Sequence, residues 1–133
     1  MSSLKMDLRR EGSGLVLVLE GQLDGNSAPE FARLVAEQIE PECRCVVISA
    51  GGLQFVSSAG LRELVTLARR LNPLGAKAIL VGVTTTVEEV LEVSGIGSFY
   101  LRAADTTQAL ALCQEREAPS GFFGRWLSGF GKS

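Results

Sequence analysis

The sequence predicts an α/β fold with a mixed, mostly parallel sheet, an N-terminal β-hairpin and about four helices, in the order β-β-α-β-α-β-α-β-α. Three observations support this prediction. Short apolar runs alternate with amphipathic segments, which is typical of parallel strands joined by crossover helices. Two strand-like segments come first, with only a short turn between them. The chain has 133 residues and is 46% hydrophobic, which suffices for one domain with its own core.

The first two elements form the predicted hairpin. Residues 4–9 alternate apolar and polar side chains like an edge strand, and residues 11–14 form a glycine-containing turn. Residues 15–20 read L-V-L-V-L-E, and this continuous apolar run predicts a strand buried on both faces. Residues 21–27 are expected to form a loop.

The first helix has a clear predicted start. Ser27 is a candidate N-cap, Pro29 lies in the first turn, and Glu30 completes a capping box with Ser27. The helix is expected to run to about Glu40, where Pro41 stops it.

The remaining elements follow the same alternation. Residues 45–50 predict a buried strand that Gly51 and Gly52 break, and the apolar spacing in residues 59–71 is helical. We further expect a strand over 76–83, a short helix capped by Thr85 or Thr86, a strand over 99–102, and a helix from Asp105 or Thr106 to about Glu117.

The composition excludes several classes of function. Thirteen basic and fifteen acidic residues give a net charge of −2, without the basic face of a nucleic-acid-binding protein. No apolar run approaches the ~20 residues of an integral membrane segment, and the N-terminus does not resemble a signal peptide, so we expect a cytoplasmic protein. The chain has no histidine, the usual base of Ser-His-Asp and Cys-His sites. An enzyme would therefore have to work with carboxylates alone, and we expect no catalytic residue, no metal and no cofactor.

The three cysteines are Cys43, Cys45 and Cys113. Their odd number and C-x-C spacing match neither a disulfide framework nor a zinc site. We predict three reduced, partly buried thiols.

Two adjacent serines, Ser57 and Ser58, lie where the third strand passes into the second helix. Serines in this position are most often caps, but they can also be nucleophiles or sites of phosphorylation. The helix N-terminus accepts an anion readily, and the small residues Ala59 and Gly60 leave room for another protein to approach.

Three segments together resemble one known family. They are LQFVSSAGLRELVTLARRL (53–71), LEGQLDGNSAPEF (19–31) and VLEVSGIGSFYLRAADTTQAL (90–110). They resemble, in the right order, the anti-sigma factor antagonists of the STAS domain family. The resemblance covers residues 4–117. It implies a STAS-like domain over 1–117, followed by a glycine- and aromatic-rich tail over 118–133.

The resemblance implies that the protein is not an enzyme and that it functions as a phosphorylation-switched antagonist in transcription regulation. The unmodified domain would bind an anti-sigma factor that is also a serine kinase; phosphorylation would break this complex, and a serine phosphatase would restore it. The family's phosphorylated serine falls on Ser58. Ser57 stands where many members have an aspartate, and it is itself a second candidate acceptor. The partner-binding residues that the resemblance implies are Asp24, Ser57, Ser58, Ala59, Gly60 and Arg62. A homodimer is also compatible with it.

Other interpretations remain open. The domain can instead be a non-phosphorylated accessory subunit of a transporter or a larger signalling assembly. A hydrolase using Ser58 lacks its histidine, and a nucleotide site lacks the G-x-x-x-x-G-K-[ST] loop. Asp24 can contact a partner or close a local turn. The tail can fold back on the domain or form an exposed patch for a partner or a membrane surface.

Overall fold

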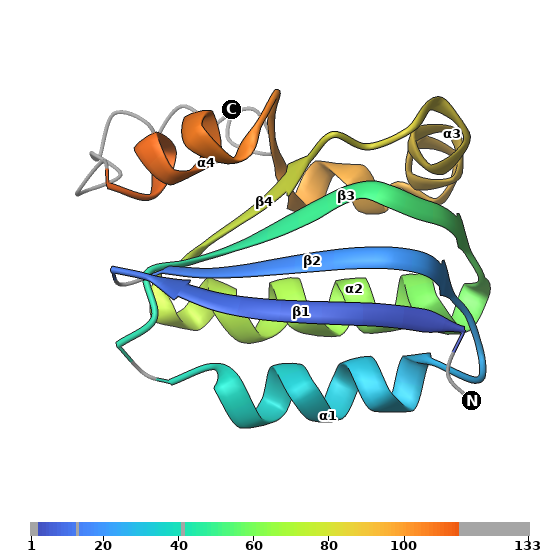
Figure 1. Ribbon diagram of the computed structural model, residues 1–133, viewed down its shortest axis with the longest axis horizontal. Helices are drawn as coiled ribbons and strands as arrows, with labels where there is room; N and C mark the ends of the chain where they lie inside the picture. The colour runs from blue at the N-terminus through green and yellow to red at the C-terminus, as the bar shows by residue number, and fades with distance from the viewer. Residues whose placement is uncertain (1–2, 13, 41, 115–133) are drawn as a thin grey trace, which may run out of the picture.

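The structure, a computed structural model, describes residues 3–12, 14–40 and 42–114. Five strands form one sheet in the order β1-β2-β3-β4-β5 (Figure 1). The β1–β2 pair is antiparallel, and the other three pairs are parallel. The predicted fold class is therefore confirmed. The strands are β1 (Leu4–Glu11), β2 (Gly14–Leu23), β3 (Cys45–Val56), β4 (Lys77–Val81) and β5 (Leu101–Ala103). The α-helices are α1 (Ala28–Gln38), α2 (Ser58–Leu71), α3 (Thr85–Ser94) and α4 (Thr106–Cys113). Two short 3-10 helices are η1 (Asn72–Leu74) and η2 (Ile96–Phe99).

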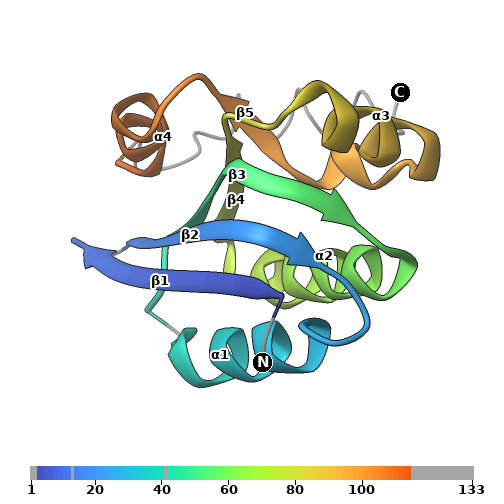
Figure 2. The same ribbon diagram turned by 45° about the vertical axis from the view of Figure 1, so that its right-hand side comes forward.

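Helices cover both faces of the sheet. Helices α1 and α2 lie together on one face, and α4 lies on the other (Figure 2). The larger core is on the α1–α2 side and includes Phe31, Leu64 and, from α3, Leu91. The smaller core lies under α4, where Ala109 packs near Val47 and Ile79.

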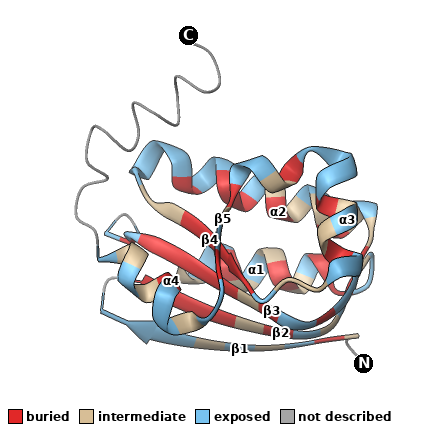
Figure 3. Cartoon of the chain, turned by 90° about the horizontal axis from the view of Figure 1, so that it is seen from above, coloured by how far each residue is buried: buried red, intermediate tan, exposed pale blue. Residues whose placement is uncertain are grey.

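The two cores explain the apolar run in β2. Leu15, Leu17 and Leu19 join the larger core, whereas Val16 between them joins the smaller one. A strand covered on both faces has no polar alternation, as the sequence predicted. Figure 3 shows this burial as red along the middle strands, while the edge strand β1 is largely exposed or intermediate.

The expectation that Gly51 and Gly52 end the third strand is wrong. Strand β3 continues through both glycines to Val56, and its pairing with β2 contains two register shifts. A Cβ atom at Gly52 would lie 2.9 Å from the Glu20 Cγ and 3.1 Å from the Leu19 carbonyl oxygen. Glycine therefore allows the two strands to approach at an irregularity, where the sequence suggested a break.

The predicted capping box of α1 is also wrong. Ser27 stands at the N-cap position, but its side chain makes no capping bond. Its hydroxyl instead donates to the Gln22 carbonyl at 2.8 Å and accepts from the Asp24 amide at 3.0 Å. Ser27 is fully buried, and it stabilises the loop before the helix.

Other boundaries differ by a few residues. Strand β2 extends to Leu23, which shortens the predicted loop, and α1 ends at Gln38. Thr84 caps α3 in place of the expected Thr85 or Thr86, and Asp105 caps α4. The expected strand over 76–83 is the shorter β4, and part of the expected strand over 99–102 is η2. Helix α4 ends at Cys113, and residues 115–117 of its predicted extent lie outside the described residues.

The expectation of three reduced cysteines is wrong for two of them. Cys45 and Cys113 form a disulfide whose Cα atoms are 5.7 Å apart, and Cys43 is a buried free thiol. The disulfide links the start of β3 to the last residue of α4. Local spacing could not reveal this pairing, because the two cysteines are separated by 68 positions in the sequence.

Candidate functional site

The candidate site lies where β2 and β3 end side by side. These strands are parallel, and Leu23 pairs with Val56 at their carboxyl ends. The Ser57 amide donates a 2.9 Å hydrogen bond to the Leu23 carbonyl. The loop containing Asp24 and the start of α2 therefore lie at the same end of the sheet, where open α/β folds usually bind their partners.

The two serines at this site differ in environment. Ser57 is the N-cap of α2, and its hydroxyl accepts a hydrogen bond from the Gly60 amide at 3.3 Å. Ser58 is the first helical residue, and its side chain is exposed. Within the described part of the chain, the Ser58 hydroxyl has no hydrogen-bond partner. Of the two serines, Ser57 fulfils the structural role, which leaves the Ser58 hydroxyl available.

Asp24 organises its own loop. Its Oδ1 atom accepts hydrogen bonds from the Asn26 amide at 3.0 Å, the Ser27 amide at 3.2 Å and the Ser3 hydroxyl at 3.0 Å. Desolvation raises the pKa of the Asp24 carboxyl, but these hydrogen bonds outweigh that effect, and the pKa lies below its usual value. The turn through Asn26 is an Asx-turn, so the structural role considered for Asp24 is present. Among the described residues no hydrogen bond joins Asp24 to Ser58.

Gly60 fixes α2 against the end of β2. A Cβ atom at this position would clash with the Leu23 carbonyl oxygen and lie 2.8 Å from the Leu23 Cγ. Gly60 is buried and Ala59 is half-buried. Gly60 allows the first turn of the helix to pack closely on the strand that precedes the Asp24 loop, so it has a packing role here.

Phe55 is a feature of the site that sequence reasoning missed. Its side chain is 47% exposed, although an apolar residue in a strand end is expected to face the core. The register shift between Gly21 and Gln22 leaves Gln54 and Phe55 both exposed between the buried Leu53 and Val56. Only knowledge of the strand pairing reveals this, since the sequence pattern L-Q-F-V itself gives no sign of a bulge.

Arg62 completes the exposed surface. It is exposed and lies four residues after Ser58, so both side chains are on the same face of α2. Phe55, Ser58 and Arg62 thus offer an aromatic ring, a hydroxyl and a guanidinium group around one helix N-terminus. We refer to these three residues as the helix-start surface.

The Cys43 thiol and the Tyr100 hydroxyl are potentially reactive groups that lie buried outside the candidate site. Burial raises the pKa of the Cys43 thiol, which disfavours the nucleophilic thiolate. Burial also raises the pKa of Tyr100, whose hydroxyl donates to the Leu64 carbonyl of α2 at 2.7 Å. Neither group is poised for chemistry at neutral pH.

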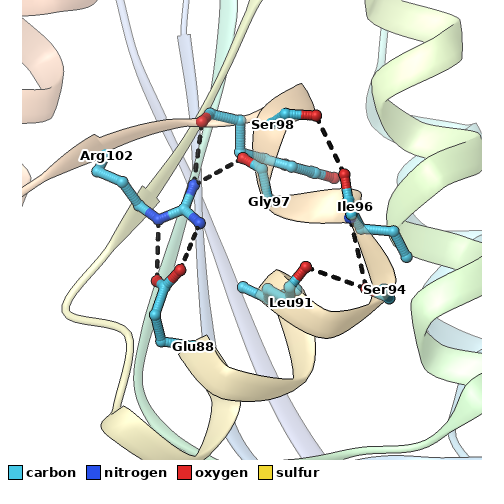
Figure 4. A network of polar contacts seen from close by, with 9 residues as sticks. Glu88, Leu91, Ser94, Ile96, Gly97, Ser98 and Arg102 are labelled. Carbon is cyan, nitrogen blue, oxygen red and sulfur yellow. Dashed lines mark hydrogen bonds and ion pairs between the residues drawn. The ribbon is translucent and has the colours of Figure 1, made fainter.

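A polar network near α3 also has a structural role (Figure 4). The Arg102 guanidinium binds both carboxylate oxygens of Glu88, at 2.9 and 3.1 Å, and the carbonyl oxygens of Gly97 and Tyr100. The hydrogen bond from Arg102, with its charge, holds the pKa of the Glu88 carboxyl below its usual value. The side chain of Arg102 therefore joins α3 to η2 and β5.

Taken together, the fold and the helix-start surface describe a small α/β domain with exposed aromatic, hydroxyl and guanidinium groups at one end of its sheet. The chain belongs to the STAS domain family, whose model matches residues 5–110. No helix in the described ranges is long and apolar enough to cross a membrane.

The chain is similar in sequence to a curated relative and similar in fold to solved structures. The chain is 28% identical over 116 residues to BtrV of Bordetella bronchiseptica, which is named as an anti-sigma factor antagonist; the match covers 87% of this chain and 99% of BtrV. The fold is similar to an anti-sigma factor antagonist from Mycobacterium paratuberculosis, with a TM-score of 0.76 and 16% identity, covering 86% of this chain and all of that one. It is also similar to the Bacillus cell fate determinant SpoIIAA in its phosphorylated form, with a TM-score of 0.66 and 19% identity, covering 81% and 99% of the two chains.

Proposed function

We propose that this protein is an anti-sigma factor antagonist that binds an anti-sigma factor through the helix-start surface and is switched by phosphorylation of Ser58. The observation that carries this proposal is the division of roles between the serines. Ser57 caps α2, whereas the Ser58 hydroxyl is exposed and uncommitted. BtrV supports the antagonist function by its name, and the phosphorylated SpoIIAA structure supports a phosphorylated state in this family.

A phosphate on Ser58 would change the docking surface directly. It adds about −1.5 to −2 charges and considerable bulk at the contact. The N-terminal end of α2 favours an anion, and Arg62 lies one turn away on the same face, so the domain itself tolerates the phosphate. The partner would lose affinity because the new charge is desolvated at the interface, while the antagonist stays folded.

The proposed partners are an anti-sigma factor that is also a serine kinase, and a serine phosphatase that restores the binding form. The chain acts as a substrate and a binding protein in this scheme and has no catalytic role. Asp24 would shape the neighbouring loop and so position the surface, and Ala59 and Gly60 would allow close approach. We place this function in the cytoplasm, where thiols would keep the Cys45–Cys113 pair largely reduced.

The test compares substitutions at two adjacent serines. Ser58→Ala should keep binding to the anti-sigma kinase and prevent phosphorylation, and Ser58→Asp should weaken binding. Ser57→Ala is the matched control: it removes the helix cap, which costs about 0.5–2 kcal/mol of stability, but it keeps the Ser58 hydroxyl. Binding is measured by calorimetry, with and without ATP, and mass spectrometry locates the phosphate.

The outcomes separate the proposal from the accessory-subunit alternative. Loss of affinity on addition of ATP in the wild type, and its absence in Ser58→Ala, would support the switch. Equal affinity of wild type, Ser58→Ala and Ser58→Asp, with no effect of ATP, would contradict it and favour a non-phosphorylated accessory role. Phosphate found on Ser57 alone would move the acceptor to that residue.

A further inference from the structure

An apolar cavity lies at the opposite end of α2 from Ser58. It has a volume of about 160 Å³, and its apolar lining includes Ala68, Leu71, Ala78, Phe99, Tyr100 and Leu101. The polar side chains in its lining are those of Arg69, Asn72 and Lys77. Phe99 at this cavity is 44% exposed, which is unusual for a phenylalanine next to a core. An apolar cavity of about 150 Å³ is large enough to hold a benzene ring. The cavity therefore has the size and chemistry to accept one aromatic side chain.

The described chain ends close to this cavity. The Lys77 side chain, at the start of β4, donates to the Leu112 carbonyl near the end of α4, and Lys77 also lines the cavity. Strand β5 pairs with β4 only from Ile79 onward, so Lys77 and Ala78 lie outside that ladder. The chain thus leaves α4 near the start of β4. At this edge of the sheet, β5 does not lie between the face that α4 covers and the cavity.

In the oxidised state that the structure shows, the Cys45–Cys113 disulfide fixes this exit point. It joins the last residue of α4 to the start of β3, and Cys45 pairs in register with Lys77. Any segment that follows Gln114 begins two residues after Leu112, whose carbonyl accepts the hydrogen bond from Lys77 of the cavity lining. A short tether of this kind raises the effective concentration of the segment at the cavity.

The segment that follows is rich in aromatic residues. It contains Phe122, Phe123, Trp126, Leu127 and Phe130. Phe122 is eight residues beyond Gln114, a length that spans up to about 26–29 Å when extended and about 15 Å on average when flexible. The first aromatic residues can therefore reach the cavity without strain.

We propose that the aromatic segment 122–130 of this same chain docks on the apolar cavity between α2, β4 and η2, with one aromatic ring filling it. The occupant is the chain's own segment because the cavity matches one ring, the exit of α4 is next to its wall, and the tether has sufficient length. Docking would cover Phe99 at the end of α2 that is remote from Ser58. The proposal is therefore independent of the phosphorylation switch.

The protein carries its own reporters for this proposal. Trp126 is the only tryptophan and Tyr100, which lines the cavity, is the only tyrosine. In the full-length chain, the fluorescence of Trp126 should be blue-shifted and its quenching by acrylamide several-fold weaker than in the urea-unfolded chain. Energy transfer from Tyr100 to Trp126 should be efficient in the native chain and lost in urea.

A pair of matched variants locates the docking surface. Phe99→Asp places a charge at the cavity and should raise the quenching of Trp126 to nearly the level of the unfolded chain. Phe55→Asp changes a phenylalanine of similar exposure at the other end of α2 and should leave the quenching unchanged. Circular dichroism checks that both variants are folded. If Phe99→Asp does not fold, the energy transfer in the wild type decides.

Several outcomes would overturn the proposal. One is that Trp126 in the native chain is quenched by acrylamide as strongly as in urea, or that it shows no energy transfer from Tyr100. Another is protection that persists unchanged in a folded Phe99→Asp variant. Protection that disappears on dilution would indicate a second copy as the occupant, and protection that arises only on addition of anionic lipid vesicles would indicate a membrane surface.

Discussion

The Ser57 amide and the Leu23 carbonyl oxygen are 2.9 Å apart, and this hydrogen bond connects the two strand ends that form the helix-start surface. Gly60 packs on the same carbonyl from the first turn of α2. The position of Ser58 is therefore set by contacts of its neighbours, while its own side chain has no hydrogen-bond partner among the described residues.

The first prediction concerns Gly60→Ala. Although alanine favours helix, its Cβ would clash with the Leu23 carbonyl oxygen, and relieving the clash requires a backbone shift. Overpacking of this kind typically costs about 1–3 kcal/mol of the free energy of unfolding. Urea denaturation measures the loss, with Gly25→Ala as the control because a Cβ at Gly25 meets no atom within 4 Å. Equal stabilities of the two variants would mean that α2 is not held by this contact.

The second prediction concerns the Glu88–Arg102 ion pair and pH. The pKa of Glu88 is lowered in the folded state, so the pair stabilises the protein above the unfolded pKa, and this contribution is lost as the pH falls through the folded pKa. Both side chains are 35% exposed, so we expect only about 0.5–1 kcal/mol.

The variant Glu88→Gln isolates this contribution. Its free energy of unfolding should be lower than that of the wild type near pH 7, and the difference should shrink in the acid range below the ordinary Glu pKa of about 4.3. Asp24 also has a lowered pKa and titrates in the same range, but it is common to both proteins and cancels in the difference. A difference that is constant from neutral to acid pH would contradict the assignment to Glu88.

Much of the fold follows from the sequence, because each helix and strand has a local signal. The apolar run of β2 and the cap at Asp105 depend on neighbouring residues alone, and both were predicted. The continuation of β3 through Gly51 and Gly52 depends on its pairing with β2, a partner that a local pattern does not contain. Likewise, Ser27 has the sequence of a cap, but the turn made by Asp24 directs its hydroxyl elsewhere.

At the candidate site too, the sequence predicted what depends on local signals and did not predict what depends on tertiary contacts. The alternation of strand and helix patterns placed Ser57 and Ser58 at a helix start, and the structure confirms that position. The assignment of the cap to Ser57 required hydrogen-bond geometry, and the exposure of Phe55 required the register shift. The roles of these residues in binding and phosphorylation remain predictions.

The third prediction concerns the Cys45–Cys113 disulfide. Because the bond spans 68 residues, chain-entropy arguments give a stabilisation of about 4 kcal/mol, which is an upper value if the reduced unfolded chain keeps structure. Reduction by a dithiol should lower the free energy of unfolding of the wild type. Cys113→Ser should abolish this effect of reduction, whereas Cys43→Ala should retain it because Cys43 is not part of the bond. Three titratable thiols in the air-oxidised, unfolded wild type would show that the disulfide does not form.

The last prediction concerns the boundary of the folded domain. We propose that residues 1–117 form the domain and that residues 118–133 are dispensable for its folding. The STAS model matches residues 5–110, and the core residues that the structure describes lie between Leu4 and Cys113. A chain ending at Glu117 should therefore keep a cooperative thermal transition.

If residues 122–130 dock on the cavity, the truncation should also lower the unfolding temperature. Removing residues 118–133 uncovers the cavity beside Phe99, so the truncated chain should unfold at a somewhat lower temperature, by the few degrees that about 1 kcal/mol represents for a domain of this size. In Phe99→Asp, where docking is already lost, the same truncation should change the midpoint little. Calorimetry tests both statements on four proteins: the wild type, the truncated wild type, Phe99→Asp and the truncated Phe99→Asp. A truncated chain without a cooperative transition would place the tail in the core, since only a segment needed for folding would abolish the transition.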